Sequence, residues 1–146
     1  MIDNSLEEVI LSAGCLCTHV KGTSMNPMLY ENKHKVYIER NVNRLNVGDV
    51  ALYKRLSGEY VLHRVMKVNN ESYVFCGDNH FVLERGILDN QILGVLKGYY
   101  ENDKFIDLDK SFKYKVYKTF WGKSLACRRF LNFFRKIKNK LFGKKS

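Results

Sequence analysis

Short apolar stretches, separated by turn residues such as Gly48-Asp49 and Asn69-Asn70, fill the first two thirds of the chain. Seven of these stretches are rich in β-branched and aromatic residues, as strands usually are. The expected strands cover residues 16–21, 35–39, 50–55, 60–68, 73–76, 92–100 and 104–108. Strands this short and closely spaced predict a mainly β fold of antiparallel sheets.

The two ends of the chain have the longer period of helices. Residues 1–14 predict a short helix with Asn4 or Ser5 as its N-cap and Gly14 as its stop. In the last quarter of the chain, apolar residues recur at spacings of three and four with Lys and Arg between them. This pattern predicts a basic amphipathic helix at the C-terminus.

The distribution of charged residues also changes where the expected strands give way to the C-terminal helix, near residue 110. The 146 residues carry a net charge of +10, yet residues 110–146 hold 13 Lys or Arg and no Asp or Glu. Residues 1–109 hold the other 12 basic and all 15 acidic residues, a net charge of −3. A chain of this length suits one domain with its own core. We therefore expect a domain over residues 1–109 and a basic tail over residues 110–146, interrupted at Gly122 and Gly143.

The tail has three alternative roles. Aromatic residues between Lys and Arg suit a helix that lies on an anionic membrane surface, and we favour this role. Packing of the helix on the body is the second alternative. Nucleic acid is disfavoured as a partner because no motif that reads bases accompanies the charges.

The four cysteines, Cys15, Cys17, Cys76 and Cys127, do not have the spacing of a metal site. A single C-x-C pair with no second pair and no histidine at metal spacing is weak evidence for zinc. We therefore expect reduced structural thiols, no metal and no cofactor.

No stretch of the sequence suits a membrane span or a secretory signal. The longest uncharged run, residues 9–20, has 12 residues, whereas a spanning helix needs about 20. Asp3, Glu7 and Glu8 stand where a secretory signal would carry positive charge. We expect a cytoplasmic protein, with peripheral attachment at the inner face of the membrane as the alternative.

Candidate chemistry begins with Ser24, in the stretch Gly22-Thr23-Ser24-Met25-Asn26-Pro27. This serine lies between an expected strand and a turn set by Pro27, where a helix can begin. Its hydroxyl could be exposed there, with backbone N–H groups aimed at a developing oxyanion. The competing interpretation is that Ser24 only caps that helix.

His63, in the expected strand over residues 60–68, is the second candidate. A histidine in an apolar strand is either a structural residue or, if two strands bring it to Ser24, a general base. The third candidate is the run Gly77-Asp78-Asn79-His80, which Glu84 follows. Carboxylates where a strand meets a loop can orient an imidazole, although Gly-Asp-Asn also suits a plain turn.

The order of these motifs resembles that of the signal peptidase I family. The matching boxes are Ser-Met-x-Pro at Ser24, Val-Gly-Asp-Val over residues 47–50, His-Arg-Val at His63, Gly-Asp-Asn at Gly77 and Leu-Gly-Val at Leu93. The resemblance covers about residues 18–100. The self-cleaving repressor peptidases share the same general fold, with looser boxes.

This resemblance implies a serine endopeptidase with Ser24 as its nucleophile. It implies that His63 is the general base, because the archaeal and endoplasmic-reticulum branch has a histidine where bacterial members have a lysine. Asp78 and Glu84 fall on acidic positions of that branch, and either one would orient the imidazole and stabilise its charged form.

The resemblance also implies the residues around the oxyanion. The Ser24 N–H is the expected donor, with Met25 beside it as a substrate-positioning residue. Much of the family has a hydroxyl residue two positions before the nucleophile, where this chain has Gly22; the hydroxyl of Thr23 is one position off.

Family members usually have a transmembrane anchor before the Ser-Met box and lack a basic tail. This sequence shows no anchor in the roughly 20 residues before Ser24, and it has a basic tail. Because of these two differences, we expect a specialised peptidase that cleaves a leader, signal or precursor peptide inside the cell or at the inner membrane surface. The alternative is a catalytically inactive β module of the same fold that binds a peptide or an anionic membrane surface. A self-cleaving regulator is disfavoured, because no DNA-binding domain precedes the core and no lysine occupies the base position.

Overall fold

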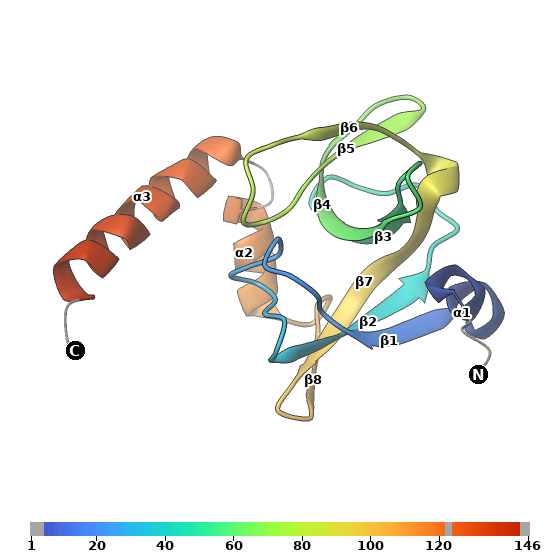
Figure 1. Cartoon of the computed structure of the whole chain (residues 1–146), viewed down its shortest axis with the longest axis horizontal. Helices are drawn as coiled ribbons and strands as arrows, with labels where there is room; N and C mark the ends of the chain where they lie inside the picture. The colour runs from blue at the N-terminus through green and yellow to red at the C-terminus, as the bar shows by residue number, and fades with distance from the viewer. Residues whose placement is uncertain (1–4, 122–123, 144–146) are drawn as a thin grey trace.

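The central element of the fold is one antiparallel β-sheet. The structure is a computed structural model that describes residues 5–121 and 124–143. Within these residues eight strands form the sheet, in the order β1-β2-β7-β3-β4-β5-β6, and β8 pairs with β7 (Figure 1). The strands are β1 Cys15–His19, β2 His34–Arg40, β3 Val50–Lys54, β4 Tyr60–Val68, β5 Ser72–Cys76, β6 Glu84–Leu88, β7 Ile92–Glu101 and β8 Lys104–Asp107. Strands make up 36% of the described residues and helices 28%, so the prediction of a mainly β fold is confirmed.

The long strand β7 joins the parts of the sheet. One of its edges pairs with β2, and the other pairs first with β3 and then with β8. Figure 1 shows it as the yellow strand that runs from the β3–β6 region to β1, β2 and β8. Because of this arrangement, β1, which leads into the loop with Ser24, and β4, which holds His63, belong to the same sheet although β2, β7 and β3 lie between them.

Strand β6 is the strand that the sequence analysis missed. It pairs with β5, and only Ile87 of its five residues is buried. Arg85 and Gly86 interrupt any run of apolar residues there, and Gly86 has a left-handed φ of 76°. A strand with one inward side chain carries almost no alternation of apolar and polar residues, so it could not be recognised.

The expected N-terminal helix forms as α1, Leu6–Ala13. The Ser5 hydroxyl accepts a hydrogen bond from the Glu8 N–H and caps the first turn. Gly14 ends the helix with a left-handed φ of 75°. Asn4, the alternative cap, lies outside the described residues.

The basic C-terminal part of the chain forms two helices, α2 Phe112–Trp121 and α3 Leu125–Phe142. A short 3-10 turn, η1 Asp89–Gln91, precedes β7. Gly143 follows α3, and its N–H donates to the Asn139 carbonyl. Gly122, the other expected interruption, lies outside the described residues.

Helix α2 packs on the body, beyond the expected boundary at residue 109. Lys118 Nζ lies 2.9 Å from a carboxylate oxygen of Asp49. The Tyr114 hydroxyl accepts a hydrogen bond of 3.3 Å from Arg64, and the Trp121 indole donates to the Asp78 carbonyl at 2.9 Å. The second alternative for the tail, packing on the body, thus describes α2, whereas most of α3 is exposed.

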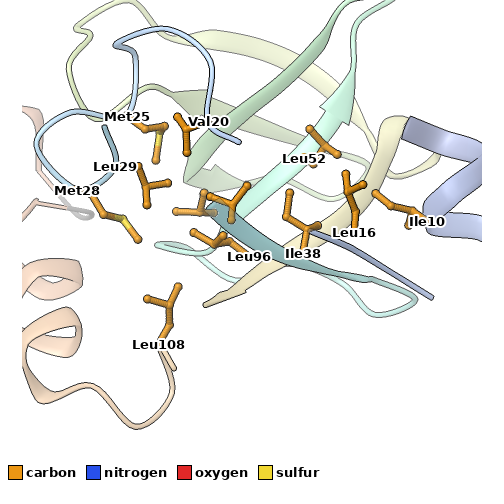
Figure 2. Packing of buried hydrophobic residues seen from close by; sticks show 12 residues of the cluster. Ile10, Leu16, Val20, Met25, Met28, Leu29, Ile38, Leu52, Leu96 and Leu108 are labelled. Atoms are coloured by element: carbon orange, nitrogen blue, oxygen red, sulfur yellow. The ribbon is translucent and has the colours of Figure 1, made fainter. Parts of the chain in front are cut away.

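Two clusters of buried apolar side chains form the core. The first joins α1, β1 and β2 to the loop that follows β1, and Figure 2 shows Met25, Met28 and Leu29 of that loop inserted into it. The second lies among β3, β4, β5 and β6 and includes Tyr53, Val65 and Phe75. The β1–β2 loop therefore derives its position from three buried side chains rather than from regular structure.

In the described part of the chain, no helix combines the length and the apolar character that crossing a membrane requires. The same residues contain no group of three or more His, Cys, Asp or Glu side chains placed to hold a metal ion. All four cysteines are free thiols, and Cys76 is buried.

Candidate active site

Ser24 lies in consecutive turns between β1 and β2. The Asn26 N–H donates to the Thr23 carbonyl at 3.1 Å, and the Leu29 N–H donates to the Met25 carbonyl at 2.9 Å. The helix expected after Pro27 does not form, so the interpretation of Ser24 as an N-cap is wrong. Pro27 has no N–H to donate, and burial of Met25 and Leu29 in the core sets the course of the chain instead.

The loop from Gly77 to His80 brings Ser24, His63 and His80 together. The Asn79 N–H donates to the Ser24 carbonyl at 2.8 Å, which joins the two loops. A Cβ atom on Gly77 would lie 2.7 Å from the Ser24 carbonyl oxygen, 3.0 Å from His63 Nε2 and 3.1 Å from His80 Nδ1. Three elements thus converge on a residue that has room for no side chain.

Ser24, His63 and His80 line one cavity of about 730 Å³. Apolar side chains line much of the rest of it, including Val36, Ile38, Leu52 and Leu62. In the part of the chain that the structure describes, no hydrogen bond joins the Ser24 hydroxyl to His63. Catalytic hydrogen bonds are often long without a substrate and tighten when one binds.

His63 faces this cavity from β4. Its side chain is buried, and its ring centroid lies 5.8 Å from that of His80. Burial, with a contribution from His80, lowers the pKa of His63 to about 4. The imidazole is therefore neutral at pH 7 and has a free lone pair with which to accept a proton.

Tyr53 is a residue of this site that sequence reasoning missed. Its hydroxyl lies 3.4 Å from His63 Nδ1, on the side of the ring away from Gly77. Tyr53 is fully buried, and burial together with the nearby Glu84 carboxylate raises its pKa well above the ordinary value. The hydroxyl remains protonated, so it can accept the Nδ1–H of His63 and donate its own proton elsewhere.

Glu84, at the start of β6, lies near both Tyr53 and His63. Arg55 binds its two carboxylate oxygens at 2.9 and 2.6 Å. Hydrogen bonds from Arg55 and then Tyr53 lower the pKa of Glu84, so the carboxylate is charged at neutral pH. Of the two carboxylates expected behind the imidazole, Glu84 is therefore connected to it through Tyr53.

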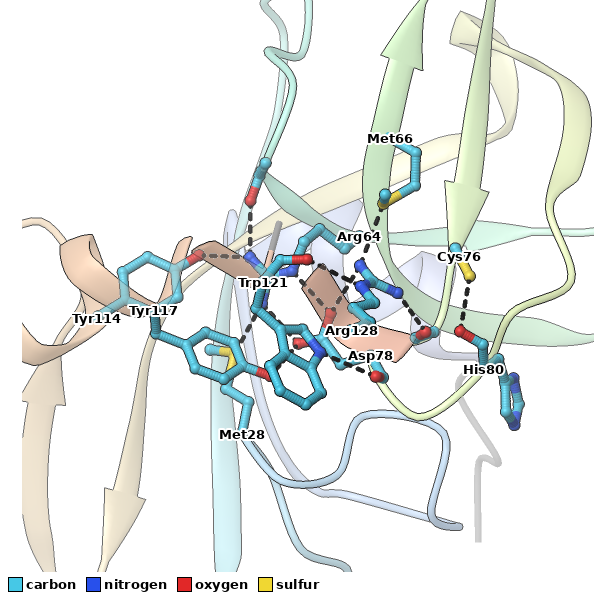
Figure 3. A network of polar contacts seen from close by, with 12 residues as sticks. Met28, Arg64, Met66, Cys76, Asp78, His80, Tyr114, Tyr117, Trp121 and Arg128 are labelled. Carbon is cyan, nitrogen blue, oxygen red and sulfur yellow. Dashed lines mark hydrogen bonds and ion pairs between the residues drawn. The ribbon is translucent and has the colours of Figure 1, made fainter. Parts of the chain in front are cut away.

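Asp78 has other partners. Its carboxylate oxygens lie 2.8 and 2.7 Å from Nε and Nη2 of Arg64, and both side chains are fully buried. The Tyr117 hydroxyl donates to Asp78 at 3.1 Å, and Arg128 lies 3.4 Å away (Figure 3). These contacts hold the Gly77–His80 loop to β4 and to the C-terminal helices.

The residues expected around the oxyanion occupy one side of the cavity. Gly22, Ser24 and Met25 line it, whereas Thr23 is not among the lining residues. Met25 is only 2% exposed and belongs to the first core cluster. Gly22 has a left-handed φ of 75°, and open space surrounds the position of its absent Cβ.

Two more residues of the site were missed. His80 directly follows the Gly-Asp-Asn motif and was named in that run, but the sequence pattern predicted no role of its own for it. Arg128 is fully buried and donates to the Gly77 carbonyl at 2.8 Å. In the sequence, Arg128 looks like any other cation of a basic helix.

Comparisons of this chain with models of protein families, with curated proteins and with solved structures found no match.

Proposed function

We propose that the protein is a serine endopeptidase that cleaves a leader, signal or precursor peptide with Ser24 as nucleophile and His63 as general base. The observation that carries this proposal is that Ser24 and His63 line one cavity, while the Ser24 carbonyl oxygen and His63 Nε2 both lie beside Gly77. The apolar lining of the cavity suits a peptide with apolar side chains next to the cleaved bond.

The first chemical step needs a neutral base near the serine. The Ser24 hydroxyl oxygen attacks the peptide carbonyl carbon, and His63 Nε2 takes the hydroxyl proton. The low pKa of His63 means that the imidazole is already unprotonated at neutral pH. His63 then returns the proton to the departing amine, and water hydrolyses the acyl group on Ser24 by the same route in reverse.

Tyr53 and Glu84 would hold the imidazole in the correct tautomer. If Nε2 is to accept a proton, Nδ1 must carry the ring hydrogen, and the Tyr53 hydroxyl is the acceptor closest to it, at 3.4 Å. The Tyr53 hydroxyl would then donate to Glu84, which Arg55 holds in place. The chain Arg55–Glu84–Tyr53–His63 would thus act as the orienting group behind the base.

The second candidate is an inactive module that binds a peptide without cleaving it. The specific observation in its favour is that no hydrogen bond joins Ser24 to His63 in the described structure. On this alternative, the cavity would hold an extended peptide against its apolar wall with no change to the peptide's bonds.

Cleavage of a peptide library, followed by mass spectrometry, tests the proposal. Ser24→Ala and His63→Ala should each reduce the rate of cleavage by several orders of magnitude, because the two residues act as a unit. Ser57→Ala is the matched control, since Ser57 is exposed in the turn between β3 and β4 and is not one of the residues that line the cavity. Undiminished cleavage by Ser24→Ala would refute the assignment, and bound but intact peptides in the unaltered protein would support the inactive module.

A further inference from the structure

Helix α3 exposes a long apolar surface. Within its 18 residues, the large apolar side chains that are most open to solvent range from 37% to 79% exposed. They are Phe130, Leu131, Phe133, Phe134, Ile137, Leu141 and Phe142. Phe130, Phe134, Ile137 and Leu141 follow one another at spacings of four, three and four, so they form one stripe along the helix, called here the apolar stripe.

The other side of α3 is strongly basic. The helix contains six Lys or Arg and no Asp or Glu. Five of these cations are exposed: Arg129, Arg135, Lys136, Lys138 and Lys140. A helix with an aromatic stripe and flanking cations has the pattern of a helix that lies in the interface of a membrane.

The first turns of α3 are fixed to the body while the apolar stripe is left open. Arg128 is fully buried and donates to the Trp121 and Gly77 carbonyls, each at 2.8 Å. From there the helix extends away from the sheet (Figure 1). The body thus holds α3 by its first turns and does not cover Phe130, Phe134 or Leu141, which are 63%, 51% and 70% exposed.

We propose that α3 binds the surface of an anionic lipid bilayer, with its apolar stripe among the headgroups and acyl chains and its cations at the lipid phosphates. Charge complementarity selects this occupant. A second copy of α3 would place its five exposed positive charges close to the five of the first copy, with no acidic residue of either helix between them. Nucleic acid would satisfy the cations but leave the apolar stripe in water. The proposal does not depend on the peptidase activity.

Vesicle flotation with the full-length protein tests this proposal. The vesicles contain either phosphatidylglycerol with phosphatidylcholine or phosphatidylcholine alone, at about 0.15 M salt, where exposed charges are screened beyond roughly 8 Å. The stripe variant carries Phe130→Gln, Phe134→Gln and Leu141→Gln, since glutamine favours helices. The matched control carries Val42→Gln, Leu56→Gln and Val82→Gln, which remove from the body three apolar side chains that are more exposed than those of the stripe.

We expect the unaltered protein and the matched control to float with the anionic vesicles and to float far less with the neutral ones. The stripe variant should bind the anionic vesicles at least about tenfold more weakly, with its circular dichroism unchanged. Flotation of the stripe variant equal to that of the unaltered protein would overturn the proposal, as would no flotation of the unaltered protein. Dimers that the stripe substitutions abolish, without lipid binding, would assign the apolar stripe to a second copy and also overturn it.

Discussion

Arg64 and Asp78 form a two-pronged ion pair in the interior, with N–O distances of 2.8 and 2.7 Å and no exposure of either side chain. Arg64 follows His63 directly in β4, and successive side chains of a strand point to opposite faces. His63 therefore faces the cavity while Arg64 holds the loop that contains Asp78 and His80. The ion pair connects the base of the proposed reaction to the loop on which Ser24 rests.

Removal of one partner from this ion pair should destabilise the protein strongly. Arg64→Met or Asp78→Asn leaves a buried group without its partner, which costs about 3–5 kcal/mol. Urea unfolding measures the change. Lys97→Met is the control, since Lys97 and Asp109 are 42% and 81% exposed and such pairs contribute at most about 1 kcal/mol. Equal losses for the buried and the exposed pair would contradict this account.

Tyr53→Phe should reduce the rate of cleavage without loss of the fold. The substitution keeps the ring, whose centroid lies 4.5 Å from that of Phe75, and removes only the hydroxyl near His63. We expect kcat to fall at least about tenfold with little change in KM, but by less than the roughly 10⁴-fold effect of a lost charged partner.

Tyr73→Phe is the matched control for this prediction. Tyr73 is also fully buried in the second core cluster, but its hydroxyl donates to Asp89, away from the cavity. If both variants lose activity equally, the effect comes from packing and Tyr53 does not position the imidazole.

The activity should persist into moderately acidic solution. Because the pKa of His63 is lowered to about 4, the imidazole stays unprotonated as the pH falls past 6, and kcat/KM for cleavage should decline only near pH 4. His80→Asn removes a positive charge that opposes protonation of His63, so it should move this decline to higher pH. Arg55, Glu84 and Asp78 also act on His63 and are unchanged in that variant.

Circular dichroism at each pH separates loss of the fold from loss of the base. A decline centred near pH 6.5 in the unaltered protein, with the fold intact, would exclude a buried His63 as the base.

Much of the fold followed from local patterns in the sequence. β-branched and aromatic runs predicted seven strands, and Ser5 and Gly14 bounded the first helix as expected. Strand β6 was missed because a single inward residue, Ile87, gives no alternation. The N-cap interpretation of Ser24 was wrong, since no helix begins after Pro27, where the burial of Met25 and Leu29 outweighs local preference.

The sequence predicted Ser24 and His63 but not Tyr53 or Arg128, because the register of paired strands cannot be read from the sequence alone. Ala51 lies opposite His63 in the β3–β4 pair, so Tyr53, two residues further along β3, is the diagonal neighbour of His63 on the same face. No local pattern in the sequence predicts which residues of β3 and β4 lie opposite each other. Likewise, nothing near Arg128 shows that the Gly77 carbonyl, 51 residues earlier, will accept its hydrogen bond.

That hydrogen bond has a thermodynamic consequence. Arg128 belongs to α3, and Gly77 is the point at which Ser24, His63 and His80 meet. If a membrane shifts α3 relative to this loop, lipid binding and peptide binding become linked equilibria. A peptide in the cavity would then change the affinity of α3 for lipid by the same factor by which lipid changes the affinity for the peptide. Binding of α3 to a membrane would thus regulate the binding of peptide in the cavity.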